Sequence, residues 1–452
     1  MKLILKLSIL ATLAILILVA LGSIKNLTRE RKQRLLSVKQ NIAASYAGEQ
    51  VIVGPVIRLN IREFWNERSF IKEENQWGQK EVNEIRTVSV FPSDLEFTSS
   101  LRVEERYRGI FKANVFLSSG GMQGAFTLPD PDTLRTKPNS RLEWVSATAG
   151  VHVKDPRGIS SPPSFTWNGQ KDQVLPGSQF SNLPEGFHIV LSKEDGAFQQ
   201  TVPFEIHLDL HGMQRFQVVP IASQNQVHLT SPWPHPSFIG DFLATTREIG
   251  EDGFSASWNV NGLATSAQQR FDTHGHSGLQ TMGVDLIDPV NPYPMTDRAL
   301  KYSFLFVFLT FAAFLLFELL RNLHIHPIQY GFVGIAQAVF FLLLLSLSEH
   351  IPFGTAYLLA TAGCTGIITF YLTGVLANTW QSFGFGGFLG LLYVTLFGLL
   401  QSKDHALVAG SVLLFGLLSS VMLFTRNVNW YTIGEKKAKA SDGPAISFDP
   451  TS

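Results

Sequence analysis

Two pairs of ionisable side chains lie within an otherwise apolar part of the chain. Glu349 and His350 follow a run of leucines in LLLLSLSEHIPF, and Glu318 precedes Arg321 by three residues. An acid beside an imidazole could exchange protons near neutral pH, because histidine titrates there. An acid and an arginine at spacing three could form an ion pair on one helix face. Both pairs are therefore candidate polar sites.

Each pair also has a purely positional interpretation. A charge at the centre of a bilayer costs about 2.5 to 3.5 kcal/mol on insertion scales, so Glu349 and His350 fit best at a wet interface. There they would close a turn before Pro352 opens the next helix. The functional alternative is a polar contact with the rest of the protein or a pH-sensitive pair. Glu318 and Glu349 fall near opposite ends of neighbouring predicted helices, so they do not form one catalytic acid pair.

Further polar side chains follow Glu318 in the sequence and extend this second candidate site. They are His326, Gln329 and Tyr330. The positional interpretation is that long side chains near a helix end reach toward water. The functional interpretation is a small polar site on the cytoplasmic side of the membrane. Both interpretations remain open at this point.

A third pattern, His207-x-Asp209-x-His211, places three possible metal ligands on one strand face. Imidazole and carboxylate suit zinc or copper. However, strict alternation of apolar and polar residues already explains them as the wetted face of a strand. The sequence contains no HExxH, GxSxG or Walker loop. We therefore expect no metal, no cofactor and no enzymatic activity.

Composition narrows the class of protein. Charged residues make up 16% of the 452 residues, against about 25% in ordinary soluble domains. The net charge is zero, which gives no indication of a nucleic-acid partner. The single cysteine, Cys364, lies in an apolar run and excludes an internal disulfide. The low charge content is typical of a membrane protein.

Six apolar runs are long enough to cross a bilayer, whose hydrocarbon core of about 30 Å needs roughly 20 helical residues. The first is interrupted only by Lys6, and the other five follow one another in the C-terminal part. The runs are 3–24, 303–320, 328–348, 353–376, 383–400 and 406–424. The first could be a cleaved signal peptide, but its length favours an uncleaved anchor. We therefore predict six transmembrane helices.

Basic residues near the predicted spans indicate the orientation, because cytoplasmic loops carry an excess of Lys and Arg. Lys2 and Lys6 precede the first span, Arg321 separates the second from the third, and Arg426 follows the sixth. Six spans place all of these on one side. The basic segment 25–34 disagrees, but it opens a long translocated region, where the rule weakens. We expect both termini in the cytoplasm and residues 30–298 in the periplasm.

The long region between the first and second spans has the patterning of a β domain. It begins with a helical period up to Tyr46, and the period then changes to two, as in VPFEIHLDLHG and FSASWNVN. Gly- and Pro-rich breakers separate such runs. The fold class is therefore a membrane protein of the α+β class, with a large and mostly antiparallel β domain. The predicted segments are an anchor (1–24), a juxtamembrane amphipathic helix (25–48), a periplasmic β-rich domain (49–298), a five-helix transmembrane bundle (299–425) and a cytoplasmic tail (426–452).

Several fragments, in order along almost the whole chain, resemble the CreD family of bacterial inner-membrane proteins. They are VGPVIRLN, RVEERYRGIFKANVF, VKDPRGI, LTSPWPHPSFIGDF, GVDLIDPVNPYPMTDRALKYSFLF and HPIQYGFVGIAQAVFFLLLLSLSEHIPFGTAY. The resemblance implies an inner-membrane location, an anchor with a periplasmic domain and a membrane bundle, and a link to cell envelope integrity. It implies no catalytic residue set.

Three classes of function follow from these observations. We expect a non-enzymatic protein of the inner membrane, in contact with the lipid bilayer, whose periplasmic domain binds another envelope component. A small-molecule transporter or signal transducer is the alternative, and it would need polar residues along a path through the bilayer centre. A membrane-embedded or periplasmic enzyme is the second alternative.

Overall fold

The computed structural model describes residues 3–71, 76–192, 200–288, 292–321, 325–376 and 379–401, together with isolated positions between 408 and 426. The chain forms two compact units. We call residues 33–289 the β domain, and residues 1–32 with 290–452 the membrane unit.

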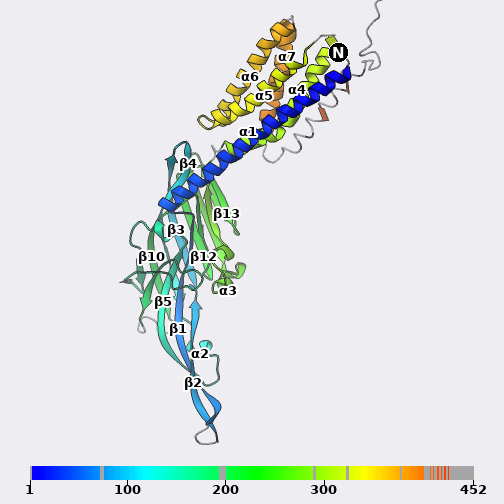
Figure 1. The fold of residues 1–452 in the computed structure, drawn as a ribbon. Coiled ribbons are helices and arrows are strands. Elements are labelled where there is room, and N and C mark those ends of the chain that lie inside the picture. Colours follow the sequence, from blue (N-terminus) through cyan, green and yellow to red (C-terminus); the bar gives the residue numbers. More distant parts are fainter. Residues whose placement is uncertain are drawn as a thin grey trace, which may run out of the picture. The chain divides into compact units, whose positions relative to one another are not determined.

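The described residues of the β domain form two sheets of eight strands each (Figure 1). The strands of sheet A are β1 Gln50–Ile71, β2 Gln76–Val90, β5 Arg141–Val153, β8 Leu175–Pro176, β9 Gly186–Leu191, β11 Arg215–Val218, β13 Pro236–Gly240 and β16 Met282–Leu286. Those of sheet B are β3 Asp94–Arg108, β4 Phe111–Thr127, β6 Ser164–Trp167, β7 Gln170–Asp172, β10 Thr201–Met213, β12 Gln224–Ser231, β14 Thr246–Gly250 and β15 Gly253–Asn261. Sheet A has the order β13-β16-β11-β1-β5-β9-β8, with β2 paired to β1. Sheet B has the order β14-β15-β12-β3-β4-β10-β6-β7.

The sheets form because apolar residues alternate along the strands. In β10 the side chains of Val202, Phe204 and Ile206 are buried, whereas the alternate residues Glu205 and His207 are exposed. The same alternation runs through β15 and the first part of β3. Buried side chains from both sheets belong to one hydrophobic cluster. The predicted period of two is therefore confirmed.

Most described strand pairings are antiparallel, as predicted, but each sheet contains one parallel pair. β1 runs parallel to β11 in sheet A, and β12 runs parallel to β3 in sheet B. Both pairs join strands that are distant in the sequence. The domain is therefore mixed, because residue patterning fixes which face of a strand is buried but not which neighbour it pairs with.

The strands β1 and β2 form a long hairpin and extend as a two-stranded ribbon (Figure 1). The third strand, β5, pairs with β1 only as far as Phe64, which faces Arg141. Just before this point Glu63 is buried and binds the loop that leads into β5. This carboxylate therefore fastens the loop where the three-stranded part of the ribbon ends.

Helix α1 runs without a break over Leu3–Ser45. The predicted anchor (1–24) and juxtamembrane helix (25–48) are therefore one continuous helix. Its final residues belong to the β domain and its first residues to the membrane unit. No proline or glycine pair interrupts residues 25–45, so nothing in the local sequence favours a break there.

The end of α1 is held by the β domain through the fragment VKDPRGI. The Arg157 guanidinium donates to the Ala44 carbonyl at 2.7 Å and pairs with Asp155 at 2.6 Å. A cation near the last carbonyls stabilises a helix C-terminus. The hydrogen bond from Arg157 lowers the pKa of Asp155, although its partial burial opposes this. Just beyond the helix, the Tyr46 hydroxyl and His211 Nδ1 lie 2.5 Å apart.

In the membrane unit, the described residues after the β domain form four further long helices. They are α4 Tyr293–Arg321, α5 Pro327–Ser348, α6 Phe353–Val375 and α7 Thr379–Gln401. Together with α1, five described helices are long and apolar enough to cross a membrane. These agree with five of the six predicted spans, and α4 begins before the predicted boundary at 299. The predicted sixth span (406–424) and tail (426–452) lie outside the described residues, apart from isolated positions.

Candidate functional site

One end of the membrane unit contains a buried polar cluster built around Glu318. The Lys6 ammonium forms an ion pair with the Glu318 carboxylate, which is 8% exposed, and donates to the Ile325 carbonyl at 2.8 Å. The hydroxyl of the fully buried Tyr330 donates to the other carboxylate oxygen at 2.7 Å. Lys6 also lies 5.6 Å from the Tyr330 ring centroid. We call Lys6, Glu318, Tyr330 and the Ile325 carbonyl the Lys6 cluster.

The structure groups the predicted residues of this region in a different way. Glu318 and Tyr330 meet, as the sequence suggested, but their cationic partner is Lys6, and the Arg321 side chain lies outside the described residues. His326 and Gln329 form a reciprocal cap at the start of α5. The Ile328 amide donates to His326 Nδ1 at 3.3 Å, and the His326 amide donates to the Gln329 side chain at 3.0 Å.

A second polar cluster surrounds Glu349, which is the C-cap residue of α5. The Tyr293 hydroxyl donates to its carboxylate at 2.9 Å, and Arg31 Nε lies 3.8 Å from the same oxygen. The Glu349 side chain is 8% exposed, whereas His350 is exposed and its ring nitrogen contacts the Ser346 carbonyl at 3.2 Å. Glu349 and His350 therefore do not share partners. We call Arg31, Tyr293 and Glu349 the Glu349 cluster.

The two clusters lie near opposite ends of α4 and α5, and each has its cation on α1. Lys6 and Arg31 are 25 residues apart on α1, which corresponds to about 37 Å at 1.5 Å per residue. Tyr293 and Glu318 have the same separation on α4. Since the hydrocarbon core is about 30 Å thick, the clusters suit its two interfaces. Each cluster joins α1 to α4 and α5 through an ion pair and a hydrogen bond. Neither cluster places a nucleophile beside a base.

Only a weak signal in the sequence points to the partners that were missed. Lys6 is the single interruption in an otherwise apolar span, and an intramembrane cation usually has a partner. That partner follows it by 312 positions. Arg31 and Tyr293 lie in polar segments where several residues of the same type compete. Only the packing of α1 on α4 and α5 selects them.

In the β domain, the three residues of His207-x-Asp209-x-His211 have separate environments. Asp209 accepts hydrogen bonds from Ser119 at 2.6 Å and Ser161 at 3.1 Å. The Ser119 hydroxyl is the main reason why the pKa of Asp209 is lowered. His207 Nε2 lies 3.7 Å from the carboxylate, and His211 binds Tyr46 instead. The described residues contain no group of three potential ligands arranged to hold a metal ion.

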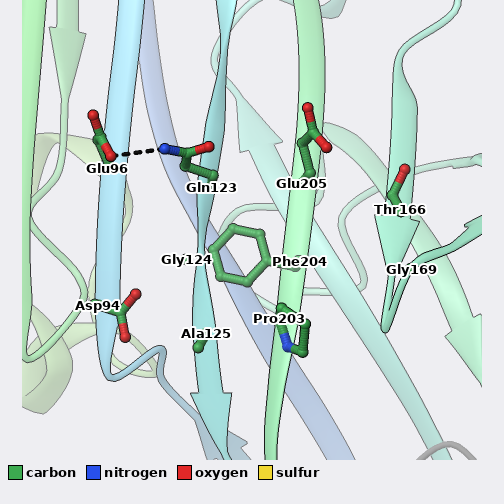
Figure 2. Close-up of a pocket in the computed structure, with 10 residues that line it drawn as sticks. All are labelled: Asp94, Glu96, Gln123, Gly124, Ala125, Thr166, Gly169, Pro203, Phe204 and Glu205. Atoms are coloured by element: carbon green, nitrogen blue, oxygen red, sulfur yellow. Dashed lines mark hydrogen bonds between the residues drawn. The ribbon is translucent and has the colours of Figure 1, made fainter.

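The outward face of sheet B is hollowed over β3, β4, β10 and β6 (Figure 2). The hollow has a volume of about 460 Å³. Its polar lining is Asp94, Glu96, Gln123, Thr166 and Glu205, and its floor is Gly124, Ala125, Pro203, Phe204 and the nearby Gly169. The Gln123 amide donates to Glu96 at 2.8 Å. We call this feature the sheet B hollow.

Gly124, in the lining of the sheet B hollow, has no room for a side chain. A Cβ atom at Gly124 would lie 2.1 Å from the Asp94 carbonyl oxygen and 3.1 Å from the Phe204 ring. Only glycine therefore fits at this position of β4. The site could not be recognised in the sequence, because each lining residue is one ordinary member of an alternating strand. Strand register alone brings these residues together.

The comparisons with known proteins agree over nearly the whole chain. The family model described as "Inner membrane protein CreD" matches residues 2–431. The inner membrane protein CreD of Escherichia coli (strain K12) is 34% identical over 432 residues, which cover 94% of this chain and 93% of that protein. This chain belongs to the CreD family. The resemblance read from the sequence fragments is thereby confirmed, and the CreD family places the chain among inner-membrane proteins.

Solved structures add little to this assignment. An M1 zinc metallopeptidase from Deinococcus radiodurans aligns with 8% identity and a TM-score of 0.20. The alignment covers 43% of this chain and 41% of that chain. A mutant of the same enzyme bound to a Tyr-Ser-Ala substrate gives 9% identity and the same TM-score. A likeness of this size carries no argument about the fold or chemistry of this CreD-family chain.

Proposed function

We propose that this CreD-family protein contributes to cell envelope integrity by binding another envelope component on the outward face of sheet B. The observation that carries the proposal is the sheet B hollow. Its volume of about 460 Å³ is in the range of roughly 300 to 1,000 Å³ that is typical of ligand sites. It offers several convergent polar groups over a partly apolar floor, as binding sites commonly do.

The proposal includes an orientation in which the β domain faces the periplasm and both termini are cytoplasmic. The basic residues Lys2, Lys6 and Arg426 support it, since they fall on one side of six spans. The two clusters, which join α1 to α4 and α5, give the membrane unit the role of an anchor. Binding is then a property of the β domain, and the membrane unit retains that domain at the inner membrane.

A photo-crosslinking experiment in living cells tests this proposal. A photoreactive amino acid at Gln123, which is exposed at the centre of the sheet B hollow, should capture an envelope component. The same amino acid at Val190, which is 57% exposed on a strand of sheet A, is the matched control and should capture much less. Equal capture from both positions, or capture from Val190 alone, would overturn the assignment to sheet B.

A separate experiment tests the orientation. An alkaline phosphatase fusion at Gly250 should be active, and one at Ser441 inactive.

One observation bears on the transporter or transducer alternative. Gln337 is fully buried near the middle of α5, and its amide donates to the Thr310 hydroxyl of α4 at 2.5 Å. Pairs of this kind commonly join membrane helices. Since the pair carries no charge and belongs to one helix contact, it supports packing of α4 on α5 better than a transport path.

A further inference from the structure

The polar residues of the sheet B hollow belong to a row that crosses six strands. Strand register places one outward side chain of each strand directly opposite the next. From β15 to β6, the row is Asn259, Gln226, Glu96, Gln123, Glu205 and Thr166. All are exposed except Thr166, which is half-buried. We call these six residues the amide–carboxylate row.

The row repeats the same kind of chemistry at a constant spacing. Neighbouring strands lie about 4.8 Å apart, so the row presents a new amide, carboxylate or hydroxyl group at about that interval. Carboxylates accept hydrogen bonds, and amides both donate and accept. Adjacent members can therefore bind a ligand hydroxyl as donor and acceptor together. Only Glu96 and Gln123 among them are joined by a described direct hydrogen bond.

The charge of the surface limits the class of ligand. The row contains two carboxylates and Asp94 adds a third at the hollow, whereas the described hollow lining contains no Lys or Arg and Lys171 on β7 lies opposite Thr166, the last member of the row. An anionic polymer would be repelled, because anion recognition relies on Lys, Arg or free backbone N–H groups. An apolar peptide would leave these polar groups without partners. A neutral ligand rich in hydroxyl groups satisfies them.

We propose that the amide–carboxylate row binds a linear, neutral glycan strand that lies across the strands of sheet B. This inference rests on the proposed function and names the ligand class of the same site. One sugar ring would occupy the hollow over Gly124 and Phe204, and the following rings would lie along the row. Polar side chains on the outward face of a sheet ordinarily do no more than contact water. The hollow, the uniform register and the excess of carboxylates over cations together distinguish this face from an ordinary one.

The test uses the full-length protein in lipid nanodiscs and two defined probes, chitotetraose and cellotetraose. Binding is measured by saturation-transfer difference NMR and by titration. We expect at least one probe to bind, and Gln123→Ala to weaken binding roughly tenfold, the usual effect of losing hydrogen bonds to a polar ligand. Ser255→Ala, on the same sheet face but outside the row, is the matched control and should bind like the wild type.

Two results would overturn the glycan inference. They are the absence of binding by both probes, and binding that is unchanged in Gln123→Ala. Crosslinking from Gln123 in cells separates this failure from that of the proposed function. Capture of a protein at Gln123 without glycan binding would retain sheet B as the binding face and reject the glycan as its ligand.

Discussion

The two units of the molecule each bury a carboxylate, and they stabilise it in different ways. In the membrane unit, Glu318 is balanced by the Lys6 ammonium, which comes from the other end of the sequence, and by the Tyr330 hydroxyl. In the β domain, Glu63 is 2% exposed and accepts hydrogen bonds from one nearby loop, through the amides of Thr136 and Lys137 and the hydroxyls of Thr136 and Ser140.

The difference follows from where free hydrogen-bond donors are available. Inside a membrane helix the backbone N–H groups are already bonded to carbonyls one turn away, so a buried acid needs a side-chain partner. A loop in a β domain has amides without such partners, and several can converge on one carboxylate. Arg86 adds a cation 3.4 Å from Glu63. Loop hydrogen-bond donors therefore stabilise the buried carboxylate of the β domain, whereas a distant lysine stabilises that of the membrane unit.

The largest expected effect comes from removing the cation of the Lys6 cluster. Lys6→Met leaves the Glu318 carboxylate buried without its charge partner, which should cost about 3 to 5 kcal/mol of stability. The measurement is the thermal unfolding midpoint of the purified protein in detergent, together with its level in membranes. The double variant Lys6→Met/Glu318→Gln should regain most of the loss, because no buried charge is left. A single variant as stable as the wild type would contradict the account of this cluster.

The second largest effect is the pH dependence of the stability that the Glu63 carboxylate gives to the β domain. Burial opposes ionisation of Glu63, but the loop hydrogen bonds outweigh it and hold its pKa at about 2. Because this lies below the value of about 4.3 for an unfolded chain, the carboxylate stabilises the folded state above about pH 5. Its contribution, about 3 kcal/mol, is lost as the pH falls from about 5 toward 2.

Glu63→Gln should therefore lower the stability of the β domain at pH 7 and weaken its dependence on pH below 5. Urea unfolding of the full-length protein, followed by tryptophan fluorescence at pH 7 and pH 3, measures the difference between variant and wild type. The difference should shrink at pH 3. An equal loss at both pH values would show that the loop does not stabilise the ionised form.

The smallest expected effect concerns the Glu349 cluster. Glu349→Gln keeps an oxygen for the Tyr293 hydroxyl and loses only the attraction to Arg31, which is 3.8 Å away and about one-third exposed. We expect a loss of no more than about 1 kcal/mol and normal insertion, measured by the same thermal unfolding. Glu349→Leu, which leaves the Tyr293 hydroxyl without its acceptor, is the comparison variant. A loss of stability as large as that of Lys6→Met would show that the two clusters stabilise the membrane unit equally, which contradicts the expected difference.

Much of the architecture could be predicted from residue patterns. Runs of apolar residues predicted the described spans, and the change of period after Tyr46 predicted the β domain, because both patterns reflect local burial. The junction within α1 was predicted less well. A change from apolar to charged residues after Ile24 suggested two segments, but composition can change along a helix without interrupting its hydrogen bonds.

The candidate sites could be predicted from the sequence only in part. Glu318 and Tyr330 are 12 positions apart and could be associated from the sequence, whereas Lys6 could not. The sheet B hollow was not predicted at all. Its residues come from strands whose order in the sheet, β3-β4-β10-β6, is not the order of the chain.

Local composition and the order of motifs were enough to predict the five described helices that are long and apolar enough to cross a membrane, the buried strand faces and the family of the chain. The tertiary structure alone decided that Lys6 neutralises Glu318, that Arg31 and Tyr293 approach Glu349, and that six polar side chains form one row across sheet B. Each of these depends on the pairing of segments far apart in the chain. Which segments pair is decided by the total burial and hydrogen bonding of the folded state, and a short stretch of sequence does not contain this information.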